Sequence, residues 1–251
     1  MGAKSIRKVM FPLKDTILRT GFPSITWTLI IINGIIFLFE ISFPKDILGM
    51  IFYHFGLVPA RYSYPRWAYI HGLPFDDYLS FLTNMFLHGG WLHIIGNMWF
   101  LHLFGSTVED RMGHGRFLLF YLLSGIASSV IYFTADIHST IPAFGASGAI
   151  AGVMGAYIVM FPKAKILTLI PIFFFPLFVE LSAFVYIGFW FLLQLFSGTL
   201  SFASPAIGGG IAWWGHIGGF IAGIALLPFF RRKLSSYRRS YPDETYHYIN
   251  R

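Results

Sequence analysis

A serine and a histidine each stand at the head of an apolar segment. Ser147 lies in the tetrapeptide GASG at 145–148, and His216 lies in WWGHIGG at 213–219. Polar side chains are costly inside a membrane, so those that occur there are candidates for function. A hydroxyl within hydrogen-bond reach of an imidazole is the arrangement of an activated nucleophile. The pair therefore suggests acyl-transfer chemistry, with Ser147 as the nucleophile and His216 as the general base.

Glycines follow both residues along their own helical faces. Gly152 and Gly155 come five and eight positions after the serine, and Gly219 and Gly223 come three and seven positions after the histidine. Small residues at such spacing let two membrane helices approach closely. We therefore expect the two segments to pack backbone against backbone and to bring the hydroxyl and the imidazole together.

Acyl transfer also needs donors for the developing oxyanion. His93 and Asn97 are four residues apart, so they share one face of a helix, and both can donate a hydrogen bond. We expect these two side chains and the backbone N–H of Ser147 to form an oxyanion hole. Further support of the site is expected from three neighbouring residues: His88, Gly145 and Gly148.

No carboxylate is placed to orient His216. Asp136 falls in an outer loop, and Glu180 falls at the inner end of the fifth apolar segment. A catalytic dyad is expected instead of a triad, with helix packing or water taking the place of the third residue that usually holds the imidazole. Asn33 and Gln194 are expected to form hydrogen bonds between helices.

The composition is that of an integral membrane protein. Of 251 residues, 56% are hydrophobic and 12% are charged, against about 25% charged in ordinary soluble domains. The absence of cysteine excludes disulfides, cysteine zinc sites and thiol catalysis. The net charge of +7 comes from the two ends and short loops and not from one face, so no nucleic-acid partner is expected. The bilayer is the expected environment.

The hydropathy pattern predicts an all-α polytopic bundle of six transmembrane helices. The predicted segments are 25–43, 82–105, 115–134, 147–162, 179–197 and 212–230. The stretch 164–178 is apolar but carries two prolines, and we expect an interfacial or re-entrant lead-in to the fifth helix; if it spans, the count becomes seven. The aromatic outer stretch 44–81 is expected to form a structured interfacial element.

Charge placement favours six spans over seven. With both termini inside, 15 of the 18 Lys and Arg residues fall on the cytoplasmic side, as the positive-inside rule requires. The predicted organisation is a basic cytoplasmic segment (1–24), a six-helix domain (25–230) and a basic cytoplasmic tail (231–251). The first segment shows no small-residue cleavage pattern, so an uncleaved first helix is expected. A bacterial inner membrane is the expected location.

Two simpler interpretations compete with catalysis. A GxSG tetrapeptide in a membrane helix is usually a packing feature. The cluster of His88, His93 and His216 could hold a metal or haem, but it lacks carboxylate partners and a His-x-x-His spacing, so no metal and no cofactor is expected. A transporter or a histidine-ligated redox protein is the third hypothesis, behind a protease and a non-catalytic membrane client-binding protein.

Four motifs together resemble the rhomboid family of intramembrane serine proteases over residues 25–230. They are, in chain order, the His…His-x-x-x-Asn block (His88, His93, Asn97), the Glu-x-Arg-x-Gly loop (Glu109, Arg111, Gly113), Gly-x-Ser-Gly (Gly145, Ser147, Gly148) and His-x-x-Gly-x-x-x-Gly (His216, Gly219, Gly223). The resemblance implies a six-helix fold that hydrolyses transmembrane protein substrates near their outer ends. It also implies the catalytic and oxyanion roles given above, and structural roles for Glu109 and Arg111.

The resemblance implies a gate and a cap over the site, and the chain departs from the family pattern at two positions. The fifth helix and the loop 198–211, with Gly198 and 208–210, look like a lateral gate and a cap. Some members place an aromatic ring four residues after the serine, where this chain has Ala151, so Phe144 or a tryptophan at 213–214 is expected to support the histidine. Many members have Trp-Arg in the first outer loop, where this chain reads Arg66-Trp67. Substrates with helix-breaking Gly or Pro near the cut are expected.

Overall fold

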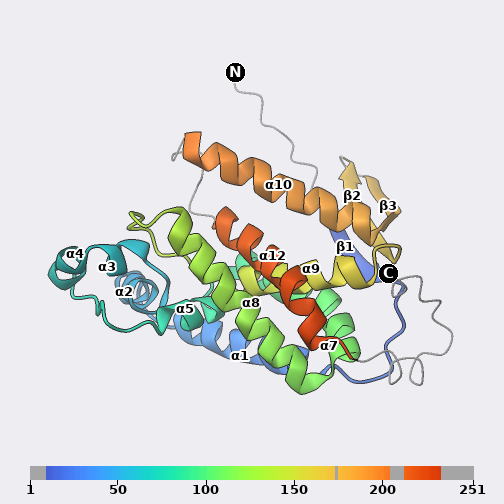
Figure 1. Ribbon diagram of the computed structural model, residues 1–251, viewed down its shortest axis with the longest axis horizontal. Helices are drawn as coiled ribbons and strands as arrows, with labels where there is room; N and C mark the ends of the chain where they lie inside the picture. The colour runs from blue at the N-terminus through green and yellow to red at the C-terminus, as the bar shows by residue number, and fades with distance from the viewer. Residues whose placement is uncertain (1–9, 173–174, 204–211, 233–251) are drawn as a thin grey trace.

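The computed structural model describes residues 10–172, 175–203 and 212–232, and it is mostly helical (Figure 1). The first half of the chain contains β1 (Phe11–Asp15), α1 (Ser24–Glu40), α2 (Lys45–Phe55), α3 (Pro59–Ser63), α4 (Pro65–Ile70), α5 (Ser80–Thr83), the 3₁₀ turn η1 (Asn84–Phe86), α6 (Trp91–Phe100), the π-helical turn η2 (Leu101–Gly105) and α7 (Ser106–Met112). The second half contains α8 (His114–Ala135), α9 (Ser147–Met160), β2 (Lys165–Ile172), β3 (Phe175–Ser182), α10 (Ala183–Ala203) and α12 (Trp213–Phe230).

A helix overlaps each of the six predicted apolar segments, but the helices differ in length. Three helices in the described part of the chain are long and apolar enough to cross a membrane: His114–Ala135, Ala183–Leu200 and Trp213–Phe230. Two shorter apolar helices are Ser24–Glu40 and Ser147–Met160. Large apolar side chains remain exposed on the outward faces of α1 and α10, including Ile35, Leu38 and Leu192. Such surfaces fit lipid better than water.

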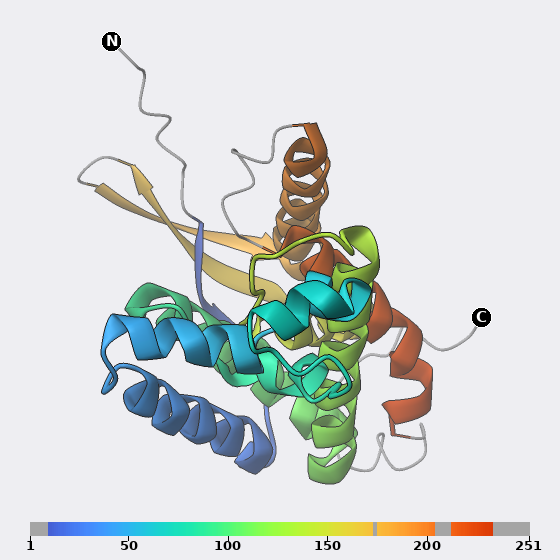
Figure 2. The same cartoon turned by 90° about the vertical axis from the view of Figure 1, so that its left-hand side faces the viewer.

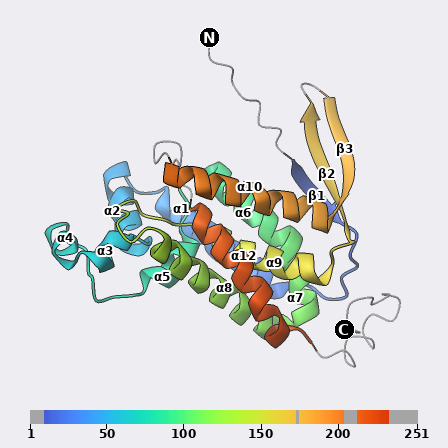
Figure 3. The same ribbon diagram turned by 45° about the horizontal axis from the view of Figure 1, so that its top comes forward.

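Helix α9 forms the centre of the helical body. Ten of its 14 residues are buried, and α8, α10 and α12 all pack against it. Most of the buried residues are Gly or Ala, and this small-residue face lets neighbouring backbones come close. Figure 3 shows α10 and α12 running past this central helix. The helices around α9 therefore also fix the position of Ser147, its first residue.

The all-α prediction is wrong for the stretch 164–178. Strands β2 and β3 form an antiparallel hairpin, and β1 joins the other side of β2 in a three-stranded sheet ordered β1-β2-β3. The fifth helix accordingly begins at Ala183 and not at 179. Pro171 and Pro176 pair with each other across the hairpin. Proline would break a helix here but is tolerated near a strand end. Figure 2 shows the hairpin projecting from the helices.

The stretch 44–81 is structured, as the aromatic content predicts. It folds into the short helices α2, α3 and α4. The fully buried guanidinium of Arg61 ties the stretch together, because it donates to the carbonyl oxygens of His54 at 2.9 Å and of Pro74. Arg66, in contrast, is exposed. The buried arginine of this stretch is therefore Arg61 and not the Arg66 of the Arg66-Trp67 pair.

Candidate active site

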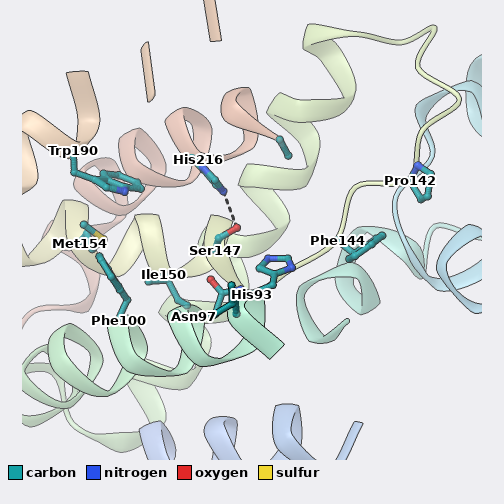
Figure 4. A pocket seen from close by; sticks show the side chains of 13 residues that line it. His93, Asn97, Phe100, Pro142, Phe144, Ser147, Ile150, Met154, Trp190 and His216 are labelled. Carbon is teal, nitrogen blue, oxygen red and sulfur yellow. Dashed lines mark hydrogen bonds between the residues drawn. The ribbon is translucent and has the colours of Figure 1, made fainter. Parts of the chain in front are cut away.

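Ser147 and His216 lie beside each other although 69 residues separate them. Ser147 is the first residue of α9, and His216 is the fourth residue of α12. The serine Oγ is 2.7 Å from the imidazole Nε2 (Figure 4). Both side chains are half-buried. This distance is that of a hydrogen bond, so the arrangement can transfer a proton from the hydroxyl to the ring.

Glycine contacts between α9 and α12 bring the two side chains together. A Cβ on Gly219 would stand 2.0 Å from the carbonyl oxygen of Gly148, and a Cβ on Gly223 would stand 2.0 Å from that of Gly152. No side chain fits at either position, so the two backbones touch. The predicted close approach of the two helices is confirmed.

The chain enters α9 through a short irregular segment, and three backbone hydrogen bonds hold it. Ala143 exchanges two of these bonds with Leu57, each of 2.9 Å, and the N–H of Gly145 donates to the carbonyl of Asn84 at 2.8 Å. Gly145 has φ +133°, a conformation that favours glycine. A Cβ there would also lie 2.7 Å from His93 Nε2. The glycine therefore allows both the turn into α9 and the close approach of the imidazole.

His93 and Asn97 face the serine from α6 (Figure 4). The N–H of Gly89 donates to His93 Nδ1 at 3.4 Å, which leaves the ring proton on Nε2, the nitrogen beside Gly145. The amide nitrogen of Asn97 is buried, and no protein group in the described chain accepts its protons. Both residues line the same cavity as the serine hydroxyl, and each carries an N–H group without a protein acceptor in the described chain.

His88 packs behind this face and does not line the cavity. Its ring centroid is 5.1 Å from that of His93, and only 1% of its surface is exposed. Its backbone N–H donates to a carboxylate oxygen of Glu40 at 3.2 Å. His88 therefore buttresses the His93 ring, and Glu40 links this region to the end of α1.

A cavity of about 500 Å³ opens in front of the serine. Residues from α6, α9, α10 and α12 and from the segment before α9 surround it (Figure 4): Leu92, His93, Gly96, Asn97, Phe100, Pro142, Phe144, Ser147, Ile150, Met154, Trp190, Ala212 and His216. The four polar side chains lie close together, with apolar side chains on either side of them (Figure 4). A cavity of this size admits a short stretch of extended peptide together with water.

The far side of the His216 ring has a polar partner that was expected only as a packing bond. Gln194 of α10 brings its Oε1 to 2.8 Å from Nδ1. The predicted hydrogen bond between helices is correct for this residue. Asn33 instead bonds within its own helix, to the carbonyl of Leu29 at 2.7 Å. The sequence shows Gln194 only as a single amide in an apolar helix, so it does not identify His216 as its hydrogen-bond partner.

The aromatic support expected for His216 differs from the arrangement found. Phe144 stacks on Phe52 with ring centroids 4.2 Å apart, so it does not support the histidine. Trp213 lies edge-on to the His216 ring at 6.2 Å, in line with the expectation for 213–214, and Trp190 lies at the same distance. Tryptophans of α10 and of the start of α12 thus provide the aromatic contact with His216 that Ala151 cannot provide.

Glu109 and Arg111 do not line this cavity, and they bond instead to residues before and at the start of α1. The buried Glu109 carboxylate accepts from the backbone N–H groups of Ile25 at 2.9 Å and Thr26 at 2.7 Å, and also from the Thr26 hydroxyl. These N–H groups belong to the first turn of α1, which has no side-chain cap of its own. Arg111 donates to the carbonyl of Leu18 at 3.1 Å.

The loop expected at 198–211 begins later than predicted. Gly198 lies inside α10 and not in a loop, because the helix continues to Ala203. Residues 208–210 fall outside the described part of the chain. Among the described residues, no group of three His, Asp or Glu side chains could hold a metal ion.

The comparisons with known proteins agree on one family. The family described as "Rhomboid domain" matches residues 76–233. "Rhomboid protease GluP" of Bacillus subtilis is 42% identical over 80 residues, 32% of this chain and 15% of that protein. "Rhomboid-like protein 11, chloroplastic" of Arabidopsis thaliana is 32% identical over 78 residues, 31% of this chain and 28% of that protein.

A third relative is "Putative rhomboid protease YdcA" of Bacillus subtilis, 33% identical over 93 residues, 37% of this chain and 46% of that protein. In all three cases the matched stretch is less than half of the relative. The relatives include proteins named as proteases and proteins named only as rhomboid-like.

Proposed function

The chain belongs to the rhomboid family of polytopic membrane proteins, and on this premise we propose that it is an intramembrane serine endopeptidase with a Ser147–His216 dyad. The observation that carries the proposal is the 2.7 Å contact between serine Oγ and imidazole Nε2 at the wall of a cavity of about 500 Å³. The contact does not depend on the two side chains alone, because close packing of glycine against glycine holds their two helices together. The substrates are transmembrane segments of other proteins.

The proposed reaction is acyl transfer to Ser147. The serine Oγ attacks the scissile carbonyl carbon while His216 Nε2 takes the hydroxyl proton. The negative oxygen of the tetrahedral intermediate then accepts from His93 Nε2–H, the Asn97 amide and the Ser147 backbone N–H. His216 passes its proton to the leaving amine, and a water deprotonated by the same imidazole hydrolyses the acyl-enzyme. His88, Gly145 and Gly148 support these groups without touching the substrate.

The length of α9 supports hydrolysis within the depth of the membrane. Fourteen helical residues rise about 21 Å, whereas the hydrocarbon layer is about 30 Å thick. If α9 ends at the inner surface, its first residue lies below the outer surface. The irregular backbone at 143–146 is tolerable there because it borders a polar cavity. Water can reach Ser147 through the same cavity.

Substrate entry is proposed between α6 and α10. Phe100 of α6 and Trp190 of α10 flank the cavity, and α10 packs on the rest of the body less extensively than α8 or α12. A substrate helix has its backbone groups bonded internally, so it must unwind before attack. Segments with Gly or Pro near the scissile bond should therefore be cut faster, and replacing those residues by Leu should slow cleavage.

The proposed topology has six crossings and both termini inside. The helices are α1, α6 with η2 and α7, α8, α9, α10 and α12, flanked by basic stretches at 1–24 and 231–251. Strand β1 pairs with β2, which fits a location of both on the inner side. The proposed location is a bacterial inner membrane. Proteolysis of protein tagged at either end, in spheroplasts and in inverted vesicles, tests the orientation.

The decisive test is cleavage of a single-span substrate by the purified full chain in liposomes. The wild type should cut it, and Ser147→Ala and His216→Ala should each abolish the product. Ser42→Ala is the matched control, because among the described residues this exposed hydroxyl bonds only to the nearby carbonyl of Phe39. A serine-reactive fluorophosphonate should label the wild type and Ser42→Ala, and leave Ser147→Ala unlabelled.

The relatives named only as rhomboid-like favour a second candidate, a membrane protein that binds clients without cutting them. This alternative makes the opposite prediction for the same variants. A folded wild type that neither cuts nor reacts with the probe, yet retains single-span proteins equally well as Ser147→Ala, would support client binding over proteolysis.

A further inference from the structure

A buried amide connects α10 to the proposed catalytic base. Gln194 Oε1 lies 2.8 Å from His216 Nδ1, on the side of the ring opposite Ser147. Only 6% of Gln194 is exposed. In the described chain, Nδ1 has no other hydrogen-bond partner. The imidazole is thus held from both ends, by Ser147 Oγ at one nitrogen and by a side chain of α10 at the other.

The orientation of the amide follows from its second hydrogen bond. The Gln194 nitrogen donates to the backbone carbonyl of Trp190 at 3.3 Å. A carbonyl oxygen can only accept, so the amide nitrogen must face it. The opposite orientation would place two oxygens against each other and an N–H₂ group against the ring. The amide oxygen therefore faces His216.

This orientation determines which ring nitrogen carries the proton. An amide oxygen accepts and cannot donate, so the proton of neutral His216 resides on Nδ1. The Nε2 lone pair is then free to accept the hydroxyl proton of Ser147. We propose that Gln194 is a positioning residue that fixes the base-competent tautomer and ring orientation of His216. The proposal rests on the proposed function, since it assigns the third member of that site.

Gln194 also stabilises the ring after proton transfer. The imidazolium formed when Nε2 takes the serine proton keeps its Nδ1–H bond to the amide oxygen. A carboxylate does the same in a Ser–His–Asp triad, where exchange for an amide costs about 10⁴ in kcat because the wrong tautomer results. A neutral amide whose oxygen is already fixed avoids that tautomer. It also avoids placing a charge in the membrane.

Among the described residues, no other neighbour of the His216 ring accepts a hydrogen bond from Nδ1. Trp190 and Trp213 pack on the imidazole with centroids at 6.2 Å, and they offer no acceptor to Nδ1. Two other titratable side chains line the cavities around the ring, His93 from α6 and Tyr132 from α8. Both face it from the side of Ser147 or α8, and no hydrogen bond joins either to His216 in the described structure.

The first test compares Gln194→Met with the wild type in the liposome cleavage assay. Methionine keeps the length and volume of the side chain but replaces the amide oxygen with a thioether sulfur, which is only a weak acceptor. We expect kcat to fall about ten- to hundred-fold while KM changes less than about two-fold, because the loss affects proton transfer and not substrate binding. Leu193→Met, at an exposed site on the same helix, is the control and should cut like the wild type.

Gln194→Glu distinguishes positioning from packing. A carboxylate restores the acceptor at the same distance, so kcat should recover to within about three-fold of the wild type. The acid limb of the kcat profile should shift to higher pH, because a negative charge favours the protonated imidazole. A merely structural role predicts no difference in kcat between the Met and Glu variants. Equal loss in the Met and Glu variants would overturn the proposal.

A spectroscopic measurement tests the tautomer without any activity. In protein labelled with ¹⁵N-histidine, the His216 signals are those absent from His216→Ala. The wild type should show a protonated Nδ1 and an unprotonated Nε2, and Gln194→Met should lose this preference. A wild type that cleaves substrate while Gln194→Met keeps both its tautomer and its kcat would refute the role of Gln194 alone. A wild type that does not cleave would instead refute the proposed function.

Discussion

Gly219 of α12 lies directly against the backbone of Gly148 in α9, where a Cβ on Gly219 would stand 2.0 Å from the Gly148 carbonyl oxygen. Gly148 follows Ser147 in the chain, and Gly219 comes about one helical turn after His216. The contact between these two glycines therefore sets how far the hydroxyl lies from the imidazole. A membrane has no hydrophobic force to press helices together, so this closeness depends on small residues.

We predict that Gly219→Ala strongly impairs proteolysis. The obstacle is a backbone oxygen, which cannot swing aside, so α12 must move away from α9 and lengthen the 2.7 Å contact between Ser147 and His216. We expect kcat to fall at least about ten-fold, because a displacement of about 1 Å can cost about 10² in rate. The melting temperature should also fall.

Gly34→Ala is the control for that substitution. Gly34 also lies within an apolar helix, α1, but a Cβ there meets nothing within 4 Å. Alanine favours a helix over glycine by about 1 kcal/mol. Cleavage should be unchanged and stability equal or higher. If both variants cut at the wild-type rate, the glycine contact does not set the catalytic distance.

The glycine spacing and the polar residues made much of the site predictable. Gly219 and Gly223 recur at a helical interval, so close packing of their helix could be inferred from the sequence alone. Gln194 was harder, because the sequence shows only an amide in an apolar run, and its partner depends on how α10 lies against α12. Which helix faces which is a tertiary property that hydropathy does not encode.

The three-stranded sheet could not be predicted because β1 lies far from the β2–β3 hairpin in the chain. Strand β1 pairs Phe11 with Leu169, more than 150 residues away. The stretch 165–182 is so apolar that a membrane-associated segment and a strand give the same hydropathy signal. The prolines at 171 and 176 argued against a helix but did not indicate a hairpin. The helical segments were predictable because their apolar runs are long.

Gly145→Ala should impair the oxyanion hole more than it impairs folding. Gly145 combines φ +133° with a position where a Cβ would lie 2.7 Å from His93 Nε2. We expect kcat to fall about 10²-fold, as when one oxyanion donor is lost. Gly72→Ala is the control, because Gly72 also has a positive φ of 66° but faces open space. It should lose stability of about 1 kcal/mol and keep its kcat.

Glu109→Gln should weaken the fold and leave the chemistry of folded molecules intact. The carboxylate satisfies two N–H groups in the first turn of α1, and an amide presents one oxygen in place of two. Leaving a buried donor unsatisfied costs about 1–3 kcal/mol. Thermal unfolding in detergent should therefore shift down by several degrees. Asp76→Asn, at an exposed carboxylate outside the helices, should leave unfolding unchanged; equal shifts would mean that surface charge and not capping is responsible.

Asn97→Ala tests whether the buried amide acts in the transition state. No protein acceptor in the described chain uses the buried Asn97 amide nitrogen, and the residue lines the cavity that contains Ser147. A developing oxyanion is the partner that it lacks, so we expect kcat to fall about 10²–10³-fold with KM nearly constant. Asn33→Ala is the matched control, because within the part of the chain that the structure describes this buried amide bonds only inside α1. It should lower stability but not the kcat of the folded fraction. A similar loss of kcat in both variants would mean that Asn97 supports the helices and takes no part in catalysis.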